Sequence, residues 1–184
     1  MSSDHKKKIA VFDLDGTLLK GDSLRALALR RIPVCPQIIH AAIRRKFLNK
    51  SRADFAERLH TAMREVFACP EELKKIIHRF AGQISYERFS VVQKWQQQGA
   101  KTILLSASPH DYVCPLAKRI AMNYGFGSHW SGDTYRHLFA KEKLLFLNSH
   151  FPKNLWEWSY AMSDSISDQP LLAMFEQHDL VDSL

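Results

Sequence analysis

The sequence contains few cysteines and no pattern that would pair them. Its 184 residues include only Cys35, Cys69 and Cys114, which are widely spaced and form no CxxC motif. Three isolated thiols indicate neither a disulfide framework nor a thiolate zinc site. We therefore expect a protein of a reducing compartment, which for this chain means a cytoplasmic location.

Long apolar runs are missing as well. No stretch reaches the length of about 18 apolar residues that a membrane-spanning helix needs, so no such helix is expected. Lysines at residues 6–8 precede an apolar stretch, but Asp13 and Asp15 interrupt it, and this argues against a secretory signal peptide. The histidines show no pair at zinc-ligand spacing. A hydrophobic fraction of 46% predicts an ordinary globular protein rather than a disordered one.

Acidic residues are nearly absent from residues 20–52. This segment contains nine Lys and Arg residues and a single acidic residue, Asp22. The segment is either a solvated basic face or a surface that attracts an anionic substrate or an anionic membrane. An apolar stripe beside Arg44, Arg45 and Lys46 fits a helix at a membrane interface, and equally the inner face of a small helical bundle. The stripe consists of Ile38, Ile39, Ala42, Ile43 and Phe47. Phe47 is the one aromatic residue in the segment, so nucleic-acid binding is not expected.

Three short apolar runs predict buried strands, at residues 7–13, 101–106 and 155–162. Polar residues and then a helical pattern follow each run. This order predicts an α/β fold with a doubly wound, Rossmann-like parallel sheet, whose functional site lies at the carboxyl ends of the strands. Between the first two runs, apolar residues recur at helical spacing, with prolines as breaks. We therefore expect a helical cap domain at residues 20–82, inserted into a core formed by residues 1–19 and 83–184.

Asp13 and Asp15 stand two residues apart at the end of the first predicted strand. Two carboxylates in such a place repel each other unless a cation or a proton lies between them, and Mg²⁺ is the hard cation that carboxylates and waters bind. Ser106 ends the second strand, and Ser108 with Pro109 predicts the N-cap and first residue of a helix. Such a helix start beside a hydroxyl suits an anion.

Two further segments complete the pattern. Lysines at 141 and 143 open a predicted helix, where a positive charge opposes the helix dipole and so indicates a purpose other than stability. Asp164 and Asp168 follow the third strand and supply two more carboxylates.

These four segments, in this order and spacing, resemble the four motifs of the haloacid dehalogenase superfamily of phosphatases, and most closely its subfamily IB, the phosphoserine phosphatase-like branch. The predicted cap at residues 20–82 matches the position of that family's C1 cap. Family members have a strand and a β-hairpin before the motif lysine, of which only residues 125–130 are recognisable here. Lys143 fits the motif because Leu144 and Leu147 follow it at helical spacing, and Lys141 is the alternative.

The resemblance implies a magnesium-dependent phosphomonoesterase. Asp13 would attack phosphorus and form an aspartyl-phosphate, and Asp15 would act as general acid and then general base. Mg²⁺ would be held by Asp13, the Asp15 carbonyl and Asp164, with Asp168 orienting its shell. Ser106 and Lys143 would bind the phosphoryl oxygens, and Thr17 would fix the second aspartate of the motif beside the phosphate.

The resemblance leaves the substrate open. We expect a small phosphorylated metabolite or an anionic lipid headgroup, with Asp22 and His110 as candidate substrate contacts. Phosphoserine phosphatases carry a glutamate where Asp22 stands, and the shorter side chain of Asp22 argues against phosphoserine as the substrate. The alternative function is a phosphate- or partner-binding module that has kept the fold without catalysis. The presence of a general acid, Asp15, argues against that alternative.

Overall fold

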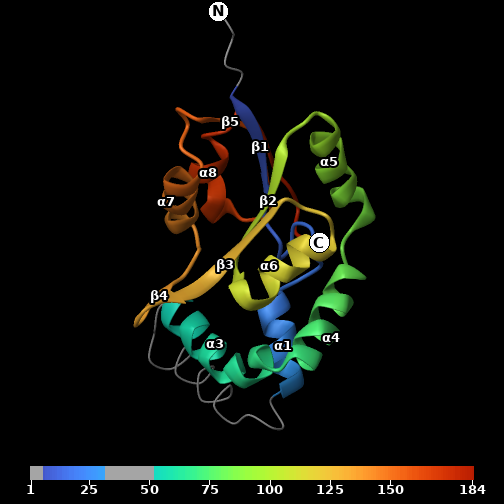
Figure 1. The fold of residues 1–184 in the computed structure, drawn as a ribbon, viewed down its shortest axis with the longest axis vertical. Helices are drawn as coiled ribbons and strands as arrows, with labels where there is room; N and C mark the ends of the chain where they lie inside the picture. The colour runs from blue at the N-terminus through green and yellow to red at the C-terminus, as the bar shows by residue number, and fades with distance from the viewer. Residues whose placement is uncertain (1–5, 32–51) are drawn as a thin grey trace, which may run out of the picture.

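The computed structural model describes residues 6–31 and 52–184. A six-stranded sheet in the order β4-β3-β2-β1-β5-β6 forms its centre, and neighbouring strands are parallel except β3 and β4 (Figure 1). The strands are β1 Lys7–Phe12, β2 Lys101–Pro109, β3 Tyr124–Ser131, β4 Thr134–Arg136, β5 Trp156–Ser163 and β6 Gln177–Leu180. The predicted doubly wound parallel α/β fold is confirmed.

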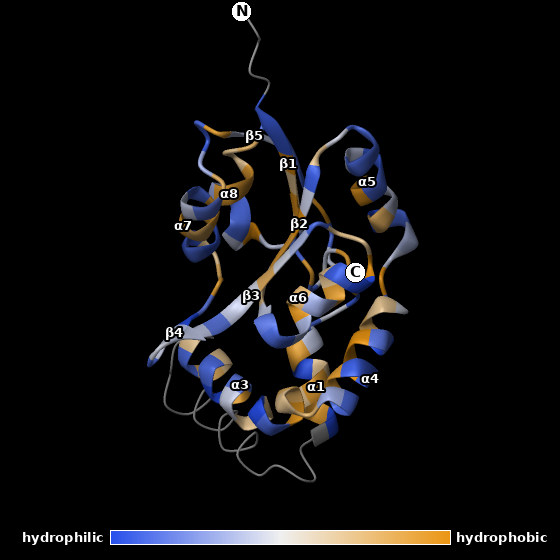
Figure 2. Cartoon of the chain, in the orientation of Figure 1, coloured by the Kyte–Doolittle hydropathy of each residue, from blue (hydrophilic) through white to orange (hydrophobic). Residues whose placement is uncertain are grey.

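Both faces of the sheet are covered, which explains why its central strands are continuous apolar runs. Along β1, Ala10 and Phe12 point into one hydrophobic cluster, whereas Ile9 and Val11 point into the other. The first cluster includes residues from α1 Ser23–Arg31, α3 Arg52–Ala68, α4 Pro70–Ala81, α5 Tyr86–Gln97 and α6 His110–Arg119. The second includes residues from α7 Lys141–His150 and α8 Gln169–Leu172. Figure 2 shows apolar residues gathered along the strands and polar residues on many outer helix positions.

The helices expected between the first two strands are present as α1, α3 and α4, and they lie together beyond the carboxyl ends of β1 and β2 (Figure 1). Phe67 of α3 and Phe80 of α4 pack against Tyr112 of α6, with ring centroids 5.7 and 5.5 Å apart. The helical segment and the sheet therefore share one apolar core. The predicted stripe of Ile38 to Phe47 and the basic residues Arg44, Arg45 and Lys46 lie outside the described residues.

The region before α7 differs from expectation. Residues 125–130 are only part of β3, which pairs with β4 in a hairpin that turns at Gly132, where φ is +58°. Trp130 and Tyr135 face each other across this hairpin at 5.3 Å. The sequence predicted only part of this hairpin, because β4 has three residues and no apolar pattern of its own.

No helix in the described parts of the chain has the length and apolar character needed to cross a bilayer.

Candidate active site

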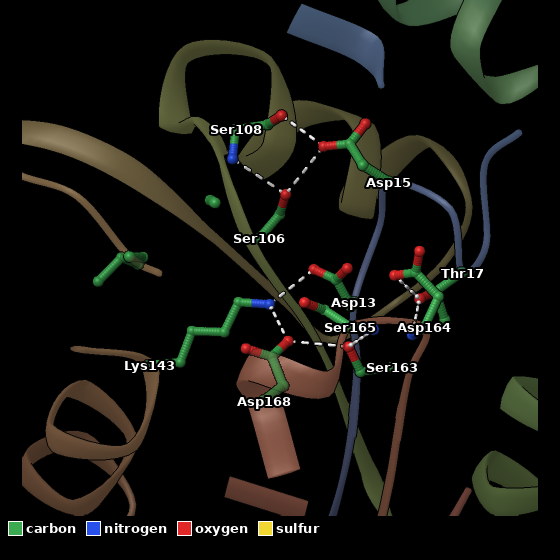
Figure 3. Close-up of polar contacts among 12 residues, drawn as sticks. Asp13, Asp15, Thr17, Ser106, Ser108, Lys143, Ser163, Asp164, Ser165 and Asp168 are labelled. Atoms are coloured by element: carbon green, nitrogen blue, oxygen red, sulfur yellow. Dashed lines mark hydrogen bonds and ion pairs between the residues drawn. The ribbon is translucent and has the colours of Figure 1, made fainter. Parts of the chain in front are cut away.

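Polar side chains from four segments meet at the carboxyl edge of the sheet (Figure 3). Asp13 and Asp15 follow β1, Ser106 lies in β2, and Lys143 lies in the first turn of α7. Asp164 follows β5, and Asp168 ends a short 3₁₀ helix, Ile166–Asp168. The strands are parallel and adjacent, so segments far apart in the sequence converge at one edge, as expected for a doubly wound sheet.

Lys143 is the lysine that the fold brings into this site. Its Nζ lies 2.8 Å from Asp13 Oδ1 and 2.7 Å from Asp168 Oδ2, and the side chain is buried. Burial by itself lowers the pKa of Lys143, but the charges of Asp13 and Asp168 outweigh it and raise the pKa, so the ammonium is retained. Lys141 is exposed at the start of the same helix.

Asp13 is buried beside this lysine, and the single ammonium does not fully offset the cost of burying the Asp13 carboxylate. Burial raises the pKa of Asp13 to about 7; Lys143 opposes this effect, and Asp168 and Asp15 add to it. Asp13 and Asp168 share a single ammonium, that of Lys143. The surroundings therefore favour a further cation close to Asp13.

Asp168 is held from one side only. Its Oδ2 accepts hydrogen bonds from Lys143 and from Ser163 Oγ, the latter at 2.8 Å. Its Oδ1 is buried and has no hydrogen-bond partner among the described residues. An unsatisfied buried carboxylate oxygen is costly, so this atom fits a donor from outside the chain, such as a metal-bound water. Ser163 was not singled out from the sequence, because it ends an ordinary apolar strand.

Asp164 is half-buried and lies against the turn that follows β1. Its backbone N–H donates to Thr17 Oγ1 at 2.9 Å, and the Thr17 hydroxyl donates to Asp164 Oδ1 at 3.2 Å. Thr17 therefore fixes Asp164, not Asp15. Gly16 has a φ of +75°, and a side chain there would overlap the Asp164 carboxylate. Glycine at position 16 thus allows the Asp164 carboxylate to approach the backbone closely, in addition to permitting the turn.

Asp15 is surrounded by donors instead of cations. Its Oδ1 accepts from the backbone N–H of Ser23 at 2.7 Å, and its Oδ2 accepts from Ser108 Oγ at 2.5 Å and from Ser106 Oγ at 3.4 Å. The prediction of Ser108 as an N-cap is wrong. Strand β2 continues to Pro109, α6 begins at His110, and the Ser108 hydroxyl is committed to Asp15. Sequence analysis missed Ser23, whose partner lies 8 residues away and whose local pattern is that of a helix start.

The two candidate substrate residues have other contacts. Asp22 is exposed, and its carboxylate accepts from the Arg25 backbone N–H at 2.8 Å, which caps α1. His110 is half-buried at the start of α6, where its Nδ1 accepts from the Gly127 N–H at 3.3 Å. Burial, and secondarily His129, lower the pKa of His110, which keeps the ring neutral. These contacts give both residues a structural role, and their contact with a substrate stays a prediction.

His60 joins the helical segment to the sheet and was not identified from the sequence. It is buried in α3, with Nε2 2.8 Å from Asp111 Oδ2 of α6 and Nδ1 3.4 Å from the Tyr135 hydroxyl of β4. Burial by itself raises the pKa of Asp111, but the hydrogen bond and charge of His60 lower it overall. The His60–Asp111 contact therefore fixes α3 next to the end of β2, which carries Ser106 and Ser108.

The described residues contain no group of three acidic, histidine or cysteine side chains close enough to form a metal centre by themselves. This does not conflict with magnesium, which binds through one or two carboxylates, carbonyl oxygens and several waters. Asp13 and Asp164 offer two carboxylates, and the unpartnered oxygen of Asp168 offers an acceptor for a bound water. The donor set therefore fits Mg²⁺.

Solved structures with the same fold include several phosphatases. A protein of unknown function from Bordetella pertussis Tohama I is 20% identical, with a TM-score of 0.72 over 95% of this chain and 89% of that one. A phosphoserine phosphatase solved as a phospho-aspartyl intermediate analogue is 15% identical, with a TM-score of 0.59 over 97% and 96%. A phosphoserine phosphohydrolase-like protein from Francisella tularensis subsp. tularensis SCHU S4 is 15% identical, with a TM-score of 0.54 over 94% and 95%. These identities establish a shared fold. No curated protein matches the sequence.

The sequence itself matches a family model over most of its length. Residues 10–173 match the model of the haloacid dehalogenase-like hydrolases, a range that contains all four converging segments. The resemblance predicted from the motifs is thereby confirmed, and the chain belongs to the haloacid dehalogenase-like hydrolase family.

Proposed function

We propose that this hydrolase is a magnesium-dependent phosphomonoesterase whose nucleophile is Asp13. The observation that carries the proposal is the contrast between the two carboxylates of one turn. Asp13 lies against the Lys143 ammonium, whereas Asp15 is held by hydroxyls and a backbone N–H. A pair of carboxylates in different surroundings suits a nucleophile and a general acid–base. A structure of similar fold that represents a phospho-aspartyl intermediate analogue supports this assignment.

The reaction would proceed in two displacements. The Asp13 carboxylate attacks phosphorus while the bond to the leaving oxygen breaks, and protonated Asp15 gives its proton to that oxygen. Asp15 then takes a proton from the water that attacks the aspartyl-phosphate. Cleavage of the bond between the Asp13 oxygen and phosphorus releases inorganic phosphate and restores both aspartates. Lys143 and Ser106 would bind phosphoryl oxygens and offset the charge on them.

Asp13, Asp164 and the Asp15 carbonyl would hold Mg²⁺, and Asp168 would orient its water shell. When bound, the ion supplies the positive charge that phosphoryl transfer needs and that one lysine cannot provide among four aspartates. The buried, unpartnered oxygen of Asp168 supports this assignment, as does the pKa of about 7 for Asp13.

The proposed substrate is a small phosphorylated metabolite that enters beneath a cap formed by residues 20–82. An anionic lipid headgroup is the alternative, suggested by the basic residues of the segment 20–52. Of these, Lys20, Arg25 and Arg30 are described and exposed. A panel of soluble phosphomonoesters and vesicle-borne lipid phosphates distinguishes the two classes. It also tests the expected cytoplasmic enzyme against one that works at a membrane surface.

The first experiment measures hydrolysis of an aryl phosphate by wild type and by Asp13→Asn, with Mg²⁺ and with EDTA. Asn keeps the size of Asp13 but removes the nucleophile, so turnover should fall by several orders of magnitude. Glu176→Gln, an equivalent change at an exposed residue just before β6, is the control and should leave turnover unchanged. Full activity in EDTA, or in Asp13→Asn, would contradict the mechanism.

A further inference from the structure

Three buried hydroxyls form a continuous chain that ends on Asp15. The Tyr112 hydroxyl of α6 lies 2.8 Å from Ser23 Oγ of α1. Ser23 Oγ lies 3.1 Å from Ser108 Oγ of β2, which donates to Asp15 Oδ2. Tyr112, Ser23 and Ser108 are each at most 4% exposed. The chain therefore links the helical segment, the sheet and the proposed general acid without contact with bulk water.

The direction of each hydrogen bond in this chain follows from proton counting. When Asp15 is ionised it can only accept, so the single hydroxyl proton of Ser108 is committed to Asp15. Ser108 must then accept from Ser23, and Ser23 must accept from Tyr112. Burial raises the pKa of the Tyr112 phenol well above its usual range, so its proton stays in place as the first donor. Aligned hydrogen bonds of this kind strengthen one another.

This chain and the Ser23 N–H hold opposite oxygens of the Asp15 carboxyl. The N–H of Ser23 holds Oδ1, and the hydroxyls hold Oδ2. The terminal torsion of an aspartate is broad, so its rotamer alone does not fix the plane of the carboxyl. Hydrogen bonds to both carboxyl oxygens do fix this plane, and proton transfer to a leaving oxygen depends on its orientation.

We propose that Tyr112, acting through Ser23 and Ser108, is a positioning residue that orients the Asp15 carboxyl for proton transfer to the leaving group. The inference rests on the proposed function and adds a residue that does not touch the substrate. Packing alone does not require the hydroxyl, since the ring lies among Phe67 and Phe80 and phenylalanine would fill that space. A buried hydroxyl lowers stability unless it is bonded, and Ser23 is its partner.

The test uses two substrates that differ in their need for a general acid. A nitrophenyl ester leaves without protonation, whereas an alkyl phosphate needs the proton from Asp15. Because kcat/KM includes only steps up to the release of the leaving group, it isolates this proton transfer from the later water attack. Tyr112→Phe should lower kcat/KM for the alkyl ester roughly tenfold, part of the full contribution of a general acid, and change the nitrophenyl ester less than about twofold.

Tyr160→Phe is the matched control, since Tyr160 is also buried and its phenol donates to a carboxylate, Asp179, outside the proposed site. It should leave both esters unchanged. Ser23→Ala breaks the same chain at its middle and should reproduce the selective loss even if Tyr112→Phe folds poorly. If Ser23→Ala and Tyr112→Phe lower kcat/KM equally for both esters, or for neither, the inference is overturned and the proposed function is not. Wild-type protein that hydrolyses neither ester would overturn the proposed function as well.

Discussion

Thr17 and Asp164 exchange two hydrogen bonds across 147 residues of sequence. The Asp164 N–H donates to the Thr17 hydroxyl oxygen, and that hydroxyl donates to the Asp164 carboxylate. Thr17 is fully buried, so bulk water does not reach its hydroxyl. The pair joins the turn after β1 to the turn after β5, and in doing so it fixes the orientation of a proposed magnesium ligand.

Thr17→Val removes both bonds at constant shape. We expect the free energy of unfolding to fall by about 1–3 kcal/mol, the usual cost of an unsatisfied buried donor. The Mg²⁺ concentration for half-maximal activity should rise, because Asp164 loses its orientation. Thr17→Ser keeps the hydroxyl and should show a smaller change in both quantities. Urea unfolding and a magnesium titration of activity measure the two effects, and an unchanged titration in Thr17→Val would contradict the role of Asp164.

Gly16 and Gly21 provide a matched pair of left-handed glycines. Their φ values are +75° and +74°, but a side chain at Gly16 meets Asp164 and Ser183, whereas one at Gly21 meets nothing. Alanine at either position should cost about 1–2 kcal/mol of backbone strain. Only Gly16→Ala should also abolish most of the activity, because it displaces the Asp164 carboxylate. Thermal unfolding and turnover of both variants test this, and equal turnover would show that the strain, not the contact, matters.

The two lysines of α7 are predicted to differ sharply. Lys143→Met keeps most of the side-chain volume but leaves Asp13 and Asp168 buried without their ammonium. Breaking a buried pair in this way costs about 3–5 kcal/mol of stability. Turnover should fall by about 10²–10³, because the positive charge that the Lys143 ammonium places beside the phosphoryl group is lost. Lys141→Met alters an exposed residue and should change stability by less than about 0.5 kcal/mol. A larger loss of turnover in Lys141→Met would reverse the assignment.

The sequence predicted the central sheet well because its strands have a strong local pattern. The runs at 7–13, 101–106 and 155–162 correspond to β1, β2 and β5 with small shifts at their ends. Adjacent parallel strands bring their carboxyl ends together, so Asp13, Ser106 and Asp164 could be expected to meet. Helices α1, α3 and α4 were predicted for the same reason, since their apolar residues recur at helical spacing.

Other parts of the fold and site had no local pattern to reveal them. Strand β6 is exposed along its length and exists through pairing with β5. Tyr112 lies 89 residues from Ser23, and Ser108 lies 93 residues from Asp15. Periodicity and capping rules act over a few residues, so they identified Ser108 only as a helix cap. Its actual partner is set by the packing of β2 beside β1.

The ionisation of Asp13 predicts how stability depends on pH and magnesium. Burial raises the pKa of Asp13 from 3.8 to about 7 in the metal-free protein. Between these values the folded state holds a proton that the unfolded state has lost, so stability should fall as pH rises through this range. The fall should be on the order of 4 kcal/mol and should level off above about pH 7.

Urea unfolding of wild type and Asp13→Asn in EDTA, from about pH 4 to about pH 8, isolates this contribution, because asparagine does not titrate. The stability of wild type relative to Asp13→Asn should decrease with pH across that range. Saturating Mg²⁺ binds the ionised carboxylate, so it should stabilise wild type increasingly as pH rises and stabilise Asp13→Asn much less. If wild type instead gains on Asp13→Asn with rising pH in EDTA, Lys143 alone is enough to keep Asp13 ionised. The need for a second cation beside Asp13 would then lose its electrostatic basis.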